Sequence, residues 1–324
     1  MDPNRRTPLM APVVESRKLV CARSRVPLPL SRVCFLLASS LWLLTSGFWL
    51  LTSAFCLRAA GWRYQLLEVK PHVFVWVPED IRDQESDPDY DRAGTAGFII
   101  TDQGVVVVNT TNSPFHAREI LFEIRARTDQ SVKFVINTDA RPDHFLGNEV
   151  FADLQATLVS TVEAQAQMRQ YQKELSRRLD GDSYLASAMR AIHPTLPTKT
   201  FQGEWTLSVG GREFRLTNVN LPTQAGAGPS PGTAVVYLPD AKVLYLGDRY
   251  ENGMIPRLES TGFKPWIEFL RQAEGWDVDV YVPGHGPPAD KREFSEFRRF
   301  LEFLSSRPDA QPPEPAPHPK ARPS

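Results

Sequence analysis

Three loops of this chain present acidic and imidazole side chains after short hydrophobic runs. The first loop follows residues 132–136 and carries Asp143 and His144, the second carries Asp248, and the third carries His285 between two glycines. Two carboxylates and two neutral imidazoles are a suitable ligand set for one divalent cation. Because strand ends are where α/β folds expose their chemistry, we expect these four side chains to converge on one metal site.

Composition narrows the chemistry of the part of the chain that folds. All three cysteines (Cys21, Cys34 and Cys56) lie in the first 56 residues, so the rest has neither a disulfide, a cysteine nucleophile nor a thiolate metal site. Any metal there must be held by His, Asp or Glu. The chain has 324 residues and a net charge of −1, which gives no global basic footprint for nucleic acid. We therefore expect a small-molecule substrate, if the protein is active, and no nucleic-acid partner.

The N-terminus has the pattern of a membrane or export segment. Residues 1–32 are basic and contain proline, with seven Lys/Arg against two acids, and residues 33–57 carry no charge. Twenty-five helical residues span roughly 37 Å, enough for a bilayer core of about 30 Å. We favour an uncleaved anchor at 33–57 with the following domain exported, over a buried core helix or a signal peptide cleaved near Ala54, which would make the protein secreted.

Between residues 62 and 306 the pattern alternates strands and helices. Gly-containing turns join paired β-branched runs, for example at Asp102–Gly104 and at Gly210-Gly211. Ser113 and Pro114 predict a helix that continues to about Thr128. Two hairpin-rich strand sets, each followed by helices, suggest an α+β fold in which two sheets pack face to face with helices outside. Residues 307–324, with seven prolines, predict a disordered tail.

The chain resembles the metallo-β-lactamase-fold hydrolases over about residues 64–305. The resemblance rests on three segments: NTDARPDHFLGN, which aligns with the family signature T-H-x-H-x-D-H-x-G-N, then TAVVYLPDAKVLYLGD, then YVPGHG. It implies the αββα four-layer sandwich. It also implies a site of two metals, most often zinc, around a hydroxide that attacks an ester, lactone, amide, thioester or phosphoester.

When the family's metal ligands are matched residue by residue, the resemblance implies that this chain has the ligands of only one of the two metals. The ligands of the second metal fall on Asp143, His144, Asp248 and His285, and all four are present. Of the three histidines that hold the first metal, two fall on Asp139 and Arg141, and the third falls near Pro229. An aspartate usual after an early strand is replaced by Asn109. The expectation is one divalent metal, zinc before iron or manganese, or no metal at all.

Arg141 is the departure with the clearest physical meaning. A guanidinium keeps its charge and cannot ligate a metal, so Arg141 places a fixed cation near the first-metal position. One interpretation is that it neutralises Asp248 and orients an anionic substrate. The other is that Asp139 and Arg141 form a plain salt bridge in a site that no longer works.

Three functions follow from these features. The first is a hydrolase with Asp143 as a catalytic residue, which uses metal-activated water on a small ester-, lactone- or amide-type substrate. The second is a catalytically inactive relative that binds a ligand or a protein at the membrane. The third is a metal-stabilised structural domain of a membrane assembly. A site closed by four protein ligands is typical of structural metals, whereas a catalytic metal keeps an open position.

Overall fold

The computed structural model describes residues 64–79, 93–181, 192–221, 232–254, 256 and 263–307. The predicted basic segment 1–32, the predicted anchor 33–57 and the proline-rich tail beyond residue 307 lie outside these ranges. Within them, no helix has both the length and the apolar character needed to cross a membrane.

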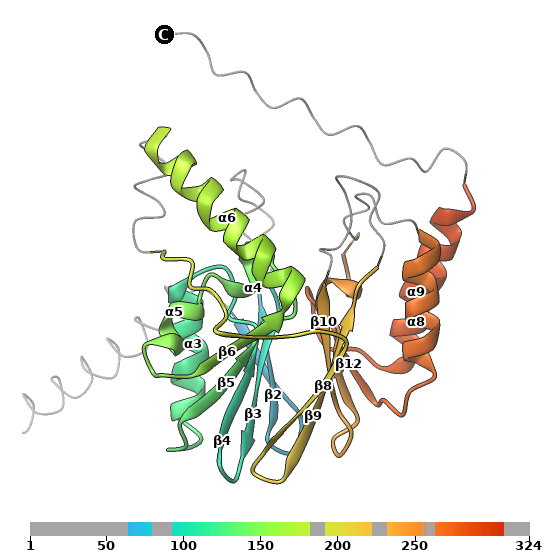
Figure 1. The fold of residues 1–324 in the computed structure, drawn as a ribbon. Helices are drawn as coiled ribbons and strands as arrows, with labels where there is room; N and C mark the ends of the chain where they lie inside the picture. The colour runs from blue at the N-terminus through green and yellow to red at the C-terminus, as the bar shows by residue number, and fades with distance from the viewer. Residues whose placement is uncertain are drawn as a thin grey trace, which may run out of the picture. The chain divides into compact units, whose positions relative to one another are not determined.

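The first sheet has seven strands in sequential order (Figure 1). Its strands are β1 (Tyr64–Lys70), β2 (Val73–Pro78), β3 (Ala96–Thr101), β4 (Gly104–Val108), β5 (Val132–Ile136), β6 (Thr157–Thr161) and β7 (Lys199–Phe201). β1 to β4 are antiparallel neighbours, and β4 to β7 are parallel ones. Every residue of β4 is buried, as expected for a strand covered on both faces.

The second sheet has five strands in the order β12-β11-β10-β9-β8. They are β8 (Glu204–Val209), β9 (Arg212–Val219), β10 (Thr233–Leu238), β11 (Val243–Tyr245) and β12 (Val280–Val282). The predicted Gly210-Gly211 hairpin is confirmed: Val209 pairs with Arg212, and both glycines have positive φ (54° and 77°), which this tight turn requires. β11 and β12 are parallel, so both point to the same edge.

The helices cover the outer faces of the two sheets (Figure 1). α3 (Pro114–Arg125) and α5 (Asn148–Ala152) lie on the first sheet, and α8 (Phe263–Glu274) and α9 (Lys291–Ser305) lie on the second. Ser113 caps α3 by accepting the His116 N–H, as predicted, although the helix ends at Arg125 instead of near Thr128. α6 (Val162–Gly181) packs its apolar side on Phe145 and Leu146 of the first site loop.

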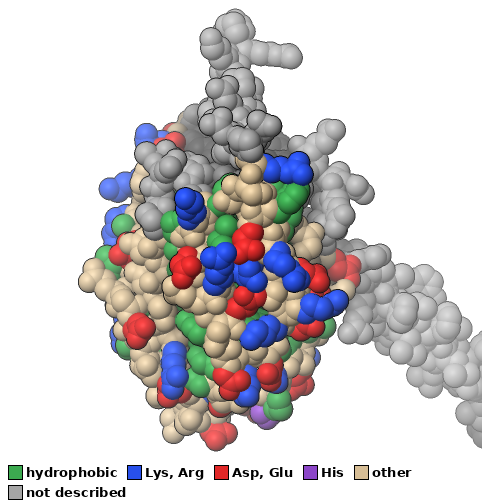
Figure 2. Space-filling model, turned by 90° about the vertical axis from the view of Figure 1, so that its right-hand side faces the viewer, with side chains coloured by type: hydrophobic (Ala, Val, Ile, Leu, Met, Phe, Trp, Pro, Cys, Tyr) green, Lys and Arg blue, Asp and Glu red, His purple; other side chains and the backbone are tan. Residues whose placement is uncertain are grey.

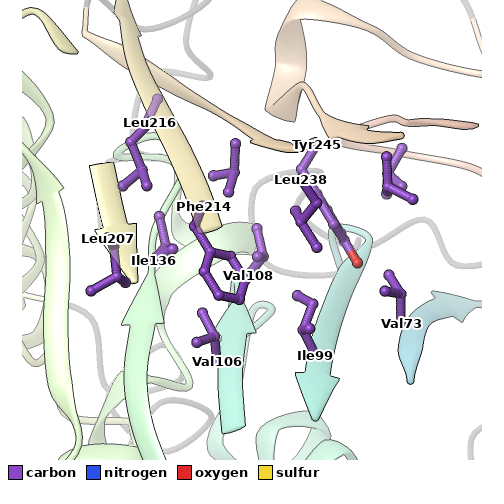
Figure 3. Close-up of a cluster of buried hydrophobic side chains, with 14 of the residues drawn as sticks. Val73, Ile99, Val106, Val108, Ile136, Leu207, Phe214, Leu216, Leu238 and Tyr245 are labelled. Carbon is purple, nitrogen blue, oxygen red and sulfur yellow. The ribbon is translucent and has the colours of Figure 1, made fainter. Parts of the chain in front are cut away.

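The core between the sheets fixes their face-to-face packing. Buried aliphatic and aromatic side chains from both sheets meet there (Figure 3), including Ile99 and Val106 from the first and Phe214 and Leu238 from the second. Separate apolar clusters bind each sheet to its helices. The predicted α+β architecture of two sheets with helices outside is therefore confirmed for the described residues.

The face that carries α8 and α9 has acidic and basic side chains intermixed (Figure 2). Arg298 pairs with Glu274 across the two helices at 2.8 Å, and Arg271 pairs with Glu302 at 2.6 Å. These bridges are partly exposed, so each contributes little to stability. Their main effect is on how α8 and α9 lie against each other.

Candidate metal centre

The site lies at one edge of the two sheets, where three strands end. β5 leads into Asn137 and the short helix α4 (Pro142–Phe145), β11 leads into the 3-10 turn Gly247–Arg249, and β12 leads into Gly284-His285. Because β4 to β7 run parallel within their sheet and β11 and β12 run parallel in theirs, the loops that follow can gather at one edge. The four predicted ligands come from these loops.

Those four side chains form one buried cluster. His144 Nε2 lies 2.9 Å from Asp248 Oδ1, and His285 Nε2 lies 3.0 Å from Asp143 Oδ2. His285 Nε2 is also 3.7 Å from Asp248 Oδ1, which joins the two pairs. The chain thus brings together Asp143, His144, Asp248 and His285, whose loops are far apart in sequence.

Arg141 joins the same cluster. Its Nε is 2.7 Å from Asp248 Oδ2 and 3.5 Å from Asp143 Oδ1, so one guanidinium faces both carboxylates. Asp139 is fully buried and accepts the backbone N–H of Arg141 at 3.0 Å and the hydroxyl of Thr138 at 2.9 Å. The charged group of Arg141 therefore compensates Asp248 and Asp143, while Asp139 holds the backbone of the loop.

A reciprocal amide pair holds the first loop in shape. Asn137 and Asn148 each donate to the other's side-chain oxygen, at 3.0 and 2.9 Å. Asn137 also donates to the His144 carbonyl at 3.3 Å, and Asn148 to the Thr195 carbonyl at 2.9 Å. Both asparagines are fully buried, so each unpaired group would cost about 1–3 kcal/mol. The ends of the sequence motif thus position its central Asp-His pair.

Sequence reasoning missed two contributors to the site. Arg249, directly after Asp248, is fully buried and donates to the Val219 carbonyl at 2.9 Å. Burial lowers its pKa to about 10, against the opposite effect of Asp139 and Asp248. The second contributor is Gly284, because a Cβ atom at this position would lie 2.3 Å from Asp248 Oδ1. The only sequence signals were their positions beside the predicted ligands.

The other histidines that the structure describes lie outside this cluster. His116 is buried in α3, its Nδ1 is 2.8 Å from the Asn112 side-chain oxygen, and its ring packs beside Trp76. Burial lowers the pKa of His116 to about 4, so it is neutral at pH 7. His72 and His193 are exposed. None of the three is a candidate ligand here.

Opposing forces set the pKa of the two carboxylates. Burial alone would raise the pKa of Asp143 and Asp248, but the neighbouring Arg141, His144 and His285 hold both pKa values below the usual range. Burial and the nearby carboxylates of Asp248 and Asp143 raise the pKa of Asp139. His144 and the Arg141 backbone N–H offset this rise in pKa only in part. Asp143 and Asp248 are therefore the anionic members of the centre at neutral pH.

The lowered pKa of Asp143 and Asp248 in the folded protein predicts that the fold is sensitive to acid. A carboxylate whose pKa is lower in the folded state stabilises the fold above its unfolded pKa of about 3.9, and the stabilisation is lost as the pH falls towards the folded value. We expect the free energy of unfolding, measured in urea, to fall steeply below about pH 4. Asp248→Asn should flatten this dependence. An equally steep fall in the variant would contradict the assignment.

The donor atoms fit a single cation. Asp143, His144 and His285 each offer one donor atom, and the three atoms lie within 4.8 Å of one another. Asp143 Oδ1 is buried and has no hydrogen-bond partner among the described residues. Arg141 Nε forms an ion pair with it at 3.5 Å but does not donate a hydrogen bond, so the oxygen can still accept a ligand. A second group of donors consists of Asp139, His144 and Asp248. It shares His144 with the first, and Arg141 stands beside it, so the two groups do not make two independent sites.

The fold and this centre define a known class of protein. The sequence description of the metallo-beta-lactamase superfamily matches residues 89–285, and the chain belongs to that superfamily. Its fold is also similar to a metallo-beta-lactamase from Pontibacter korlensis, with a TM-score of 0.56, 18% identity, and coverage of 74% of this chain and 99% of that one. At this identity the likeness shows the fold alone.

Two curated relatives in sequence are an alkylsulfatase and a subunit of an O-demethylase. The linear primary-alkylsulfatase of Pseudomonas sp. (strain ATCC 19151) is 26% identical over 228 residues, which cover 60% of this chain and 42% of that protein. The 2,4-dinitroanisole O-demethylase subunit alpha of Nocardioides sp. (strain JS1661) is 28% identical over 202 residues, 60% of this chain and 52% of that protein. The chain thus matches about half or less of the length of each relative.

A solved alkylsulfatase has the same fold. The stereoselective inverting sec-alkylsulfatase from Pseudomonas sp. has a TM-score of 0.54 and 18% identity, and the match covers 74% of this chain and 42% of that one. Together these similarities support a metal-dependent, hydrolase-like protein at the level of the family.

Proposed function

We propose that this protein binds one divalent cation and hydrolyses a small, anionic ester-type substrate. The observation that carries the proposal is the buried donor set of Asp143, His144 and His285, whose Asp143 Oδ1 has no hydrogen-bond partner among the described residues. Three protein ligands leave a coordination position open, as in catalytic sites. Zinc is the first candidate, with iron or manganese as alternatives.

A bound cation would supply Lewis acidity and lower the pKa of a water molecule. Asp143 is placed to use that water, because its unpartnered Oδ1 can accept a hydrogen bond from it and take its proton as the water oxygen attacks the ester. The bond to the alcohol oxygen breaks as the bond to the water oxygen forms, and the proton taken by Asp143 passes to the departing alcohol oxygen. Asp143 thus orients and deprotonates the nucleophile.

Arg141 is the reason for preferring an anionic substrate. Its side chain is 18% exposed while its Nε faces the two carboxylates, so the guanidinium lies between the buried cluster and solvent. A fixed cation in this position attracts a sulfate, phosphate or carboxylate group. The alkylsulfatase among the relatives supports alkyl sulfates as the first substrates to test.

The test is metal content together with turnover, using the full-length chain. We expect one equivalent of zinc after dialysis, and its loss in Asp143→Ala and in His285→Ala. His193→Ala removes an exposed histidine outside the cluster and should keep the metal. A chain that takes up no divalent metal under any condition would sink the proposal.

Turnover separates this proposal from an inactive binding protein. We expect hydrolysis of alkyl sulfates or simple esters that disappears in Asp143→Ala and on chelation. One observation favours the inactive alternative: both oxygens of Asp248 already have protein partners, His144 for Oδ1 and Arg141 for Oδ2. Binding of zinc and of an alkyl sulfate without any turnover would support that alternative.

A further inference from the structure

Asn109 stands directly behind His144. It follows β4, its φ of 62° is in the left-handed region, and it is 3% exposed. Asparagine adopts this backbone conformation more easily than most residues. Its backbone N–H donates to the Ile136 carbonyl at 2.9 Å. The side-chain amide is thus held at a fixed place between the first loop and the histidine.

The orientation of that amide is set by Thr138. Asn109 Oδ1 accepts the backbone N–H of Thr138 at 2.9 Å and lies 3.1 Å from its hydroxyl. The amide nitrogen therefore faces His144 Nδ1 at 2.9 Å, with the Thr95 carbonyl at 3.5 Å. Turning the amide over would set its N–H against the N–H of Thr138, an arrangement of two donors.

This orientation decides where the imidazole carries its proton. An amide nitrogen can only donate, so His144 Nδ1 must accept, and the proton of the neutral ring is on Nε2. Nε2 in turn donates to Asp248 Oδ1 at 2.9 Å. Nε2 therefore carries a hydrogen that it donates to Asp248, although Nε2 is also the ring atom that faces the other candidate metal ligands.

Electrostatics and the amide act in opposite directions on this ring. The carboxylates of Asp139 and Asp248 have oxygens within 4.8 Å of a His144 ring nitrogen and would favour a positive charge on the ring. A second proton would have to sit on Nδ1, where the N–H of Asn109 already points. A carboxylate at position 109 would instead accept a proton on Nδ1, as the partners of metal-bound histidines commonly do.

We propose that Asn109 is a positioning residue that keeps the His144 proton on Nε2, and that it thereby weakens cation binding at this centre. The second part rests on the proposed function. For a cation to use the Nε2 lone pair, the Nε2–H bond must break and its proton must pass to solvent or to Nδ1. In the latter case the Nδ1–H meets the Asn109 amide N–H. Asn109→Asp replaces that donor with an acceptor.

The first test reads the ring directly in the metal-free, full-length protein labelled with ¹⁵N-histidine. Two-bond ¹H–¹⁵N correlations should show His144 protonated on Nε2 alone in the wild type and on Nδ1 in Asn109→Asp. His144→Gln assigns the signals by their loss. A ring with the same protonation in both proteins, or with protons on both nitrogens of the wild type, overturns the proposal.

The second test is zinc affinity by competition with a chromophoric chelator. We expect Asn109→Asp to bind zinc at least about tenfold more tightly than the wild type. Asn252→Asp is the charge control, because Asn252 donates to the His285 carbonyl through its backbone and its side chain contacts Pro287, so the added charge lies near the site without touching His144. We expect it to change affinity about threefold or less.

The outcomes are separable from those of the proposed function. If Asn109→Asp binds zinc no more tightly than Asn252→Asp does, the inference about Asn109 is wrong. If the proton moves to Nδ1 in Asn109→Asp but neither protein binds zinc, the positioning role of Asn109 stands and the metal part of the proposed function falls.

Discussion

Replacing Arg141 with methionine should destabilise the metal-free protein by about 3 kcal/mol or more. Methionine keeps much of the apolar stem but removes the charge that faces Asp248 Oδ2 at 2.7 Å and Asp143 Oδ1 at 3.5 Å. Both carboxylates are buried, so the variant leaves two anions whose remaining close partners, among the described residues, are His144 and His285. Urea unfolding at pH 7 measures the effect.

Arg141→Lys and added zinc make this prediction specific. Lysine keeps the charge but not the planar guanidinium, so we expect a loss smaller than that of methionine. A cation bound by the carboxylates should restore much of the stability of Arg141→Met, because a ligand that binds only the folded state stabilises it. If Arg141→Met is as stable as the wild type without metal, the guanidinium does not hold this centre together.

Much of the fold could be predicted from local chemistry. The β-branched runs of β3 and β4, the Gly210-Gly211 turn and the Ser113 cap each depend on neighbours in the sequence, and each is found as predicted. The short helix α4 over Pro142–Phe145 and the strand β7 over Lys199–Phe201 were not predicted. They are three or four residues long, too short for hydrophobic periodicity to show.

In the candidate site, too, the residue types could be predicted from the sequence, whereas contacts between distant residues could not. Residue types and loop positions indicated Asp143, His144, Asp248 and His285, and the structure brings them together. The partner of Arg141 was harder, because Asp139 is two residues away in sequence whereas Asp248 is a hundred residues away. The sequence left both Asp248 and Asp139 open as partners of Arg141, and the guanidinium lies against Asp248. The role of Asn109 required the orientation of its amide, which depends on Thr138.

Gly284→Ala should damage the centre as severely as a ligand substitution. A Cβ atom on Gly284 would lie 2.3 Å from Asp248 Oδ1 and 2.7 Å from the carbonyl carbon of Gly247. Its backbone cannot retreat easily, because its N–H donates to the Tyr250 carbonyl at 2.9 Å and its carbonyl accepts the Thr95 N–H at 2.7 Å. We expect a loss of about 3 kcal/mol in the free energy of unfolding.

The matched control is Gly275→Ala, which adds the same methyl group after α8. The nearest atom to that methyl would be the Gln272 carbonyl oxygen at 3.2 Å, and no carboxylate of the centre is close. We expect its stability to change by less than about 1 kcal/mol. Displacement of Asp248 by Gly284→Ala should also weaken zinc binding by about tenfold or more, since Asp248 orients His144 through Nε2. Equal effects of the two substitutions on both stability and zinc binding would show that the close approach of Gly284 to Asp248 has no role in shaping the centre.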